Sequence, residues 1–142
     1  MPAFRPTRPT FIGHTTAGHS LASGFQPIPV DVVDQDDAGG WSGTQYTLDR
    51  DGLWLAFIFA SRNSLATATK SQTRILQNGT VIAKGGSPQI TQSVTMSLTA
   101  LFHGALGDVL DLQVLVSPTI TASINDDARV FVTRVGPKSW NF

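Results

Sequence analysis

Residues 53–60 constrain the fold more than any other segment, because all eight of them are apolar. A run of this length fits one β-strand, and a strand with two apolar faces must be covered on both. A single antiparallel sandwich leaves one face of each sheet in water. The run therefore predicts burial against another copy of the chain, through an interface that includes Leu53, Trp54, Leu55, Phe57 and Phe59.

Residue usage points to an all-β chain. Glutamate is absent and lysine is scarce, whereas threonine, serine, glycine and valine are plentiful. Such a composition is a poor source of helices and suits strands joined by tight turns. We expect no helix of any length.

Turn signals divide the chain into short strands. Asn78-Gly79 between two apolar runs predicts a two-residue hairpin, since a type I′ turn needs positive φ at both central positions. From Val94 to Ala100, apolar residues hold the even positions and Thr or Ser the odd ones, as in a half-buried strand. The whole pattern predicts an all-β domain of about eight antiparallel strands over residues 28–137, as a β-sandwich or jelly roll.

Charge and cysteine content exclude several classes of protein. The 142 residues balance ten Lys and Arg against ten Asp, which argues against nucleic acid as the main partner. There is no cysteine, so neither a disulfide framework nor thiolate chemistry is available. We see no signal peptide and no membrane-spanning segment. A net charge near zero favours association with other proteins.

The first 27 residues differ from the rest. Four prolines fall in this stretch, and each fixes φ and removes a backbone donor. We interpret residues 1–27 as an extended arm that docks on a neighbouring protein, with Phe4, Phe11 and Ile12 as its apolar contacts. Residues 138–142 form a short tail after the last strand.

Three fragments carry a resemblance to a known family. Residues 52–59 read Gly-Leu-Trp-Leu-Ala-Phe-Ile-Phe, residues 74–83 lead an apolar strand into Asn-Gly and back, and residues 105–114 contain Leu-Gly-Asp-Val-Leu. Phe131 stands in the closing strand. In this order they resemble the tumour necrosis factor and complement globular-head superfamily, across about residues 28–136.

The resemblance implies a ten-stranded jelly roll that assembles as a compact homotrimer, with apolar and aromatic residues along the three-fold axis. We see neither a collagen stalk nor a secretory signal, which points away from an animal secreted ligand. Phage tails, spikes and capsids use the same jelly roll. The arm would then replace the stalk as the docking element.

Candidate chemistry is sparse. His14, His19 and His103 lack the partners of a metal site, and no serine stands in a nucleophile elbow. Residues 34–37 and 125–127 are oxygen-rich enough for calcium, although Asp and Asn form turns equally well. Trp41, Asp36 and Asp37 share a glycine-rich loop that either meets a sugar or partner or folds back on the sandwich. We predict no enzyme, no catalytic residue and no required cofactor or metal.

We expect a structural virion protein of a tailed bacteriophage: a trimeric tail-tip or fibre-knob protein, or another minor tail component. One alternative is a capsid decoration or head-fibre protein, and the other is a sugar- or receptor-binding module for host attachment. Expected partners are two further copies of the chain, other virion proteins through the N-terminal arm, and a host surface glycan or receptor. Nucleic acid and membrane are not expected partners.

Overall fold

A computed structural model describes residues 8–140 and contains only β-strands as regular structure in that range. No helix that could cross a membrane occurs among these residues. The strands are β1 (Thr10–His14), β2 (His19–Leu21), β3 (Gln26–Pro27), β4 (Val32–Asp36), β5 (Gln45–Thr47), β6 (Gly52–Arg62), β7 (Gln72–Gln77), β8 (Thr80–Gly86), β9 (Val94–Gly104), β10 (Val109–Leu115), β11 (Ala122–Ile124) and β12 (Arg129–Gly136).

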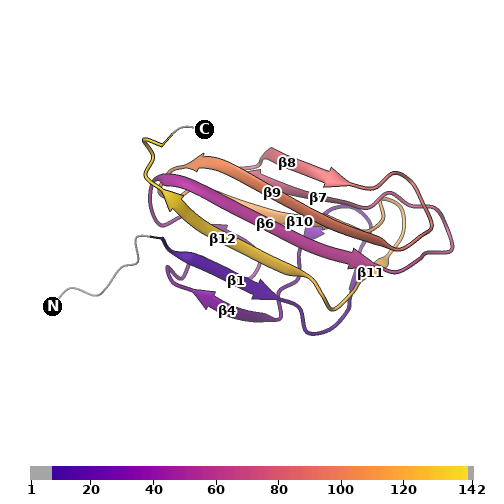
Figure 1. The fold of residues 1–142 in the computed structure, drawn as a ribbon. Coiled ribbons are helices and arrows are strands. Elements are labelled where there is room, and N and C mark those ends of the chain that lie inside the picture. The colour runs from indigo at the N-terminus through magenta and orange to yellow at the C-terminus, as the bar shows by residue number, and fades with distance from the viewer. Residues whose placement is uncertain (1–7, 141–142) are drawn as a thin grey trace.

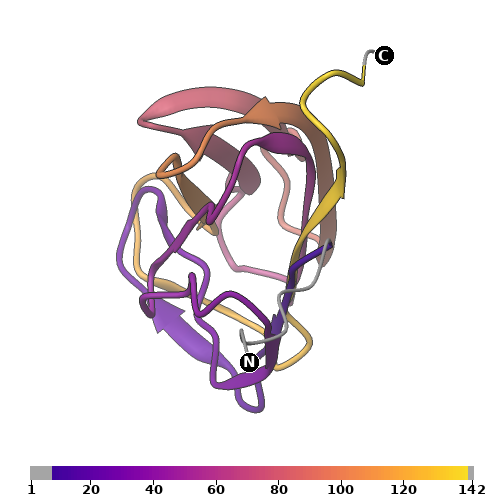
Figure 2. The ribbon, with the colours of Figure 1, turned by 90° about the vertical axis from the view of Figure 1, so that its left-hand side faces the viewer.

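Two antiparallel sheets face each other (Figures 1 and 2). The first sheet has the order β4-β1-β12-β6-β9, and the second has the order β3-β10-β7-β8, with β5 paired to β10. A short pair, β11-β2, lies outside both. Neighbours in the first sheet are far apart in sequence, as in a jelly roll. The predicted all-β jelly-roll sandwich is therefore confirmed.

The core lies between the inward faces of the two sheets. Trp54 and Ile58 from β6 meet Ile75 from β7 and Leu112 and Val114 from β10, all with no exposed surface. The central strands β6, β9 and β10 bury alternate residues over most of their length, because successive side chains of a strand point to opposite faces of the sheet. Burial of this kind contributes roughly 25 cal/mol per Å² of apolar surface.

The hairpin between β7 and β8 has the geometry that its sequence predicts. Asn78 has φ of 50° and Gly79 has φ of 82°, so both central residues occupy the left-handed region. Glycine tolerates this conformation freely, and asparagine tolerates it better than most residues. The Asn78 side chain also joins the turn to β10, since its Nδ2 donates to Asp108 Oδ1 (2.9 Å) and its Oδ1 accepts from Val109 N (2.9 Å).

The predicted boundary at residue 27 is wrong. β1 lies inside the first sheet, between β4 and β12, and β2 and β3 pair with β11 and β10. The sequence suggested an arm because prolines dominate the terminus, but Thr10–His14 is free of proline and alternates buried and half-buried residues. Residues 8–27 are thus part of the sandwich, and residues 1–7 lie outside the described range.

One end of the sandwich is closed around a buried arginine, Arg62, the last residue of β6. Its Nε donates to Ser71 Oγ, Nη1 donates to the carbonyls of Asn63 (3.0 Å) and Gln92 (2.8 Å), and Nη2 donates to those of Thr69 (3.4 Å) and Ile90 (3.2 Å). All five donors of the guanidinium are therefore used. Ser71 Oγ in turn donates to Val116 O (2.8 Å), so the arginine connects the two sheets.

Candidate assembly face

Strand β6 divides its apolar residues between the two sides of the first sheet. Trp54, Ala56 and Ile58 are fully buried in the core, whereas Leu55, Phe57 and Phe59 point the other way and stay partly exposed. The sandwich therefore covers one side of residues 53–60 completely and leaves the other side only partly covered within a single chain.

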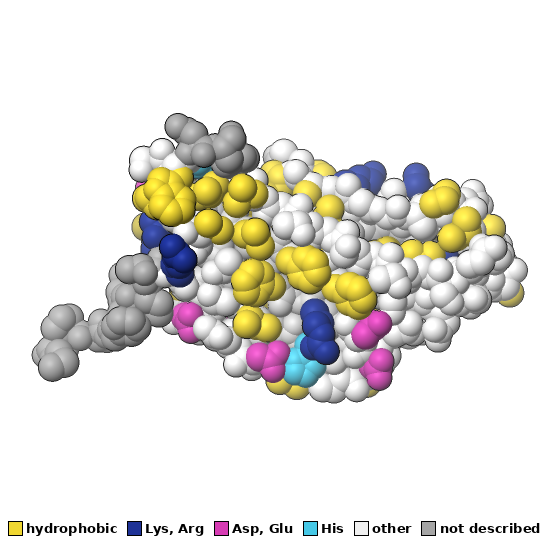
Figure 3. All heavy atoms as spheres, in the orientation of Figure 1, with side chains coloured by type: hydrophobic (Ala, Val, Ile, Leu, Met, Phe, Trp, Pro, Cys, Tyr) yellow, Lys and Arg dark blue, Asp and Glu magenta, His cyan; other side chains and the backbone are white. Residues whose placement is uncertain are grey.

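Neighbouring strands extend this apolar surface. Phe131 of β12 lies opposite Phe57, and Ile12 of β1 lies opposite Phe131. Leu101 of β9 lies opposite Leu55 and is 40% exposed. Figure 3 shows hydrophobic side chains gathered in the middle of this side of the molecule, over β6 and β12. The apolar face is defined here as Ile12, Leu55, Phe57, Phe59, Leu101 and Phe131.

Polar side chains border the apolar face on the side of β4. His14 Nδ1 lies 2.6 Å from Asp34 Oδ2, and Arg129 of β12 lies opposite His14. Figure 3 shows histidine, basic and acidic side chains together at this border. An apolar centre with a charged rim is the usual composition of a protein interface.

Two of the residues predicted for an interface, Trp54 and Leu53, are covered within the single chain. Trp54 has no exposed surface and lies in the core between the sheets, so its assignment to the interface is wrong. The reason is the two-residue period of the strand, which places Trp54 on the opposite side from Leu55. Leu53 is on the same side of β6 as Leu55, but its side chain is only 4% exposed. It lies opposite Gly136, against which the Trp140 ring packs.

The residues predicted for a docking arm are also divided between the core and the outer side of the first sheet. Phe11 has no exposed surface, and its ring stacks on those of Trp41 (centroids 4.8 Å apart) and Tyr46 (5.5 Å). Its assignment to a docking arm is wrong, because it faces the core from β1. Ile12 is half-buried on the apolar face, and Phe4 lies outside the described residues.

The loop that holds Trp41, Asp36 and Asp37 folds back on the sandwich. Trp41 is half-buried on Phe11, and its backbone N–H donates to Asp36 Oδ2 (3.1 Å). The other oxygen of Asp36 accepts from Gly40 N (3.1 Å), and Asp37 Oδ2 accepts from Thr10 N (3.1 Å). These carboxylates shape the loop, and the Trp41 ring is used to cover the core.

The histidine and aspartate side chains hold turns. Asp31 accepts from Thr16 N (2.8 Å) and lies 2.9 Å from His19 Nε2. The hydrogen bond from His19 and those from the backbone lower the pKa of Asp31 to about 2. Residues 8–140 contain neither a group of three or more His, Cys, Asp or Glu side chains placed to share a metal ion nor a pocket.

Sequence reasoning missed Phe131 and Leu101 as members of the apolar face. A signal for Phe131 was present, because Val130 and Val132 on either side of it are both buried. In a strand, an apolar residue between two inward residues must point outward. A similar signal was present for Leu101, because it is an apolar residue on the outer side of β9, where Thr95, Ser97 and Thr99 precede it.

No family model matches the sequence, and no curated protein matches it. Solved structures do match. The globular domain of zebrafish complement 1qA protein superposes with a TM-score of 0.64 at 13% identity, covering 89% of this chain and 96% of that one. Murine APRIL gives a TM-score of 0.66 at 9% identity, covering 91% and 100%.

A third solved structure, Eiger TNF from S. frugiperda, gives a TM-score of 0.63 at 10% identity and covers 95% of this chain and 96% of that one. The chain has a tumour necrosis factor/C1q-like jelly-roll fold. The fold resemblance inferred from residues 52–59, 74–83 and 105–114 is therefore confirmed. At these identities the likeness concerns the fold alone.

Proposed function

We propose that this chain is a non-catalytic structural protein that works as a homotrimer, with the apolar face buried between the three copies. Within that role, we propose that it is a virion component of a tailed bacteriophage, acting as a tail-tip or fibre-knob protein.

The observation that carries the assembly proposal is the apolar face itself. Three residues of β6 and one each of β1, β9 and β12 present large apolar side chains on one continuous sheet surface. Soluble monomers rarely expose a contiguous apolar surface of this kind. Burial between copies removes it from water, and obligate interfaces of this sort commonly exceed about 2,000 Å². The number three is what the resemblance to the tumour necrosis factor family implies, and the shared fold supports it.

The virion role is the finer part of the proposal. A chain with only 14% charged residues and a formal net charge of zero is suited to permanent contact with other proteins. Asp31 and Asp36 hold turns through hydrogen bonds from the backbone, and Asp34 pairs with His14 between two strands, which fits a scaffold rather than a reaction site.

Two matched variants test the assembly. Phe57→Asp puts a charge at the centre of the apolar face, and we expect it to convert the trimer to a folded monomer. Val81→Asp puts the same charge on β8 of the other sheet, where Val81 is 44% exposed, and should leave the trimer intact. Native mass and circular dichroism report the outcome. Equal behaviour of both variants would contradict the proposed interface.

The virion role needs a separate experiment. Antibodies raised against the purified chain should label purified phage particles at one structure, and peptides of the chain should be found in those particles by mass spectrometry. Label at the tail end supports the tail role, whereas label over the head would identify the chain as a capsid protein. Particles that lack the chain would overturn the virion proposal without affecting the assembly proposal.

A further inference from the structure

The outer side of the second sheet carries a row of residues paired across four strands, and three of the four are polar. Lys84 of β8 lies opposite Arg74 of β7, Arg74 lies opposite Gln113 of β10, and Gln113 lies opposite Pro27 of β3. Paired residues of antiparallel strands project to the same face. The neighbours of this row in sequence, such as Thr73 and Val114, are fully buried, so the row faces away from the core.

Arg74 is held in a fixed orientation. Its Nε donates to Gln113 Oε1 (2.7 Å), and its guanidinium carbon lies 3.8 Å from the centre of the Phe25 ring. These contacts use one edge and one side of the guanidinium plane. Its two terminal nitrogens make no hydrogen bond or ion pair with any residue in the range 8–140. A planar fork held in this way is suited to bind two oxygens of one oxyanion.

The two cations of this row form no ion pair with an acid of the described residues. Arg74 and Lys84 are directly opposite each other, and like charges in that position are unfavourable. Arg50 pairs with Asp49 and Lys138 lies near Asp51, but neither Arg74 nor Lys84 pairs with a carboxylate of the described residues. Asp111, on the same side of β10, accepts a hydrogen bond from Gln45 (2.9 Å).

We propose that Arg74 and Lys84 form a binding site for the oxyanion groups, carboxylate or sulfate, of an acidic polysaccharide. The two terminal nitrogens of Arg74 bind two oxygens of the group, and Lys84 adds the second positive charge. Gln113 keeps its Nε2 donor, and Gln72 lies two residues before Arg74 on the same side of β7. These amides are suited to the hydroxyl groups of the sugar that carries the anion.

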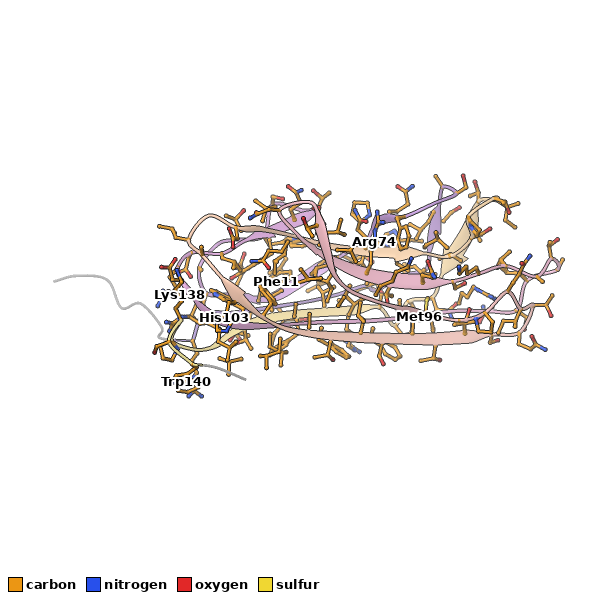
Figure 4. All side chains as sticks on the ribbon, turned by 90° about the horizontal axis from the view of Figure 1, so that it is seen from above. Phe11, Arg74, Met96, His103, Lys138 and Trp140 are labelled. Carbon is orange, nitrogen blue, oxygen red and sulfur yellow. The ribbon has the colours of Figure 1, made fainter. Side chains whose placement is uncertain are left out.

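The chemistry of the row favours a polysaccharide over other anionic partners. Two cations on a chain with no net charge give little long-range attraction to a membrane or a nucleic acid, whose binding draws on several cations together. A polysaccharide offers isolated anionic groups among many hydroxyls, which matches two cations among amides. The row is on the outer side of the second sheet and the apolar face is on the outer side of the first, so the row stays open when the apolar face is buried. Figure 4 shows Arg74 on the upper side of the sandwich in that view.

Binding of the purified full chain to three polymers of matched length tests the site: polygalacturonate, dextran sulfate and unmodified dextran. We expect one or both polyanions to bind at low salt and unmodified dextran not to bind. Arg74→Gln should weaken binding about tenfold or more, and Lys84→Gln by a smaller factor. The control Lys138→Gln removes an exposed cation elsewhere and should change nothing.

Arg74→Lys separates geometry from charge, because it keeps the cation and loses the fork. We expect it to lose most of the affinity, and wild-type affinity in this variant would contradict the site. The site would also be overturned if neither polyanion binds, including the case in which the chain binds anionic lipid vesicles instead. It would likewise be overturned if Lys138→Gln loses as much affinity as Arg74→Gln. Thermal unfolding and native mass of each variant keep these results separate from folding and assembly. Preference for polygalacturonate or dextran sulfate identifies the anion as carboxylate or sulfate.

Discussion

The outer side of the first sheet carries Leu55, Phe57 and Phe131, whereas the outer side of the second sheet carries Arg74, Lys84 and Gln113. Both sheets supply the same kind of inward residue to one shared core. The core therefore does not require the outward phenylalanines, and their presence needs a second explanation. We infer from this difference that the two outer sides serve different partners: copies of the chain on the first, and a polar ligand on the second.

The largest expected effect compares two aromatic residues on opposite sides of β6. Trp54→Ala leaves a cavity between the sheets and should lower the free energy of unfolding by about 3–5 kcal/mol. Phe57→Ala removes a half-buried ring from the outer side and should cost about 1 kcal/mol in a dilute single chain. Urea denaturation at low protein concentration measures both. Similar losses in the two variants would remove the distinction between core and outer side.

A second prediction concerns Arg62, which joins the two sheets. Burial lowers its pKa, and its charge is satisfied by one hydroxyl and four backbone carbonyls rather than by an acid. Arg62→Met leaves those acceptors without donors and should lower the free energy of unfolding by about 2–4 kcal/mol. Arg62→Lys restores some of the donors and should cost less. A fully stable Arg62→Met variant would contradict the connecting role.

Neighbouring residues of β12 provide a smaller and sharper contrast. Val130 is 1% exposed and faces the core, whereas Phe131 lies on the apolar face. Val130→Ala should lower the free energy of unfolding by about 2 kcal/mol through the loss of two buried methyl groups. Phe131→Ala should instead weaken the trimer at least about tenfold, with little change in the fold of the chain. Sedimentation equilibrium and denaturation distinguish the two effects.

The smallest expected effect is a pH dependence at the edge of the first sheet. The folded chain lowers the pKa of Asp31 to about 2 from an ordinary value of 3.8. Its contribution to stability is therefore present above pH 3.8 and is lost as the pH falls toward 2. Asp31→Asn should flatten the melting temperature over this window. An unchanged acid dependence in that variant would contradict the role given to this carboxylate.

The sequence predicted the fold well where the pattern was local. Asn78-Gly79 predicted the hairpin, and the alternation from Val94 to Ala100 predicted the half-buried strand β9. The N-terminal boundary failed because β1 gains its place from pairing with β12, more than a hundred residues away. Long-range pairing of this kind leaves only a weak trace in five residues of sequence.

The apolar face was predicted only in part. An all-apolar run predicts two covered sides but does not say which residue lies on which side, and this led to the wrong assignment of Trp54. The register with β12 and β9 decides that question. The pairing of Arg74 with Lys84 could not be predicted, because regular pairing outward from the Asn78-Gly79 turn would place Arg74 opposite Ala83. A register shift between Ile75 and Leu76 places it opposite Lys84 instead.

The mass of the wild-type chain in solution tests the central claim most directly. Sedimentation equilibrium at micromolar concentration should give three times the 15.2 kDa of one chain. A mass of 15.2 kDa under those conditions would show that the apolar face stays in water, and it would contradict the proposed assembly.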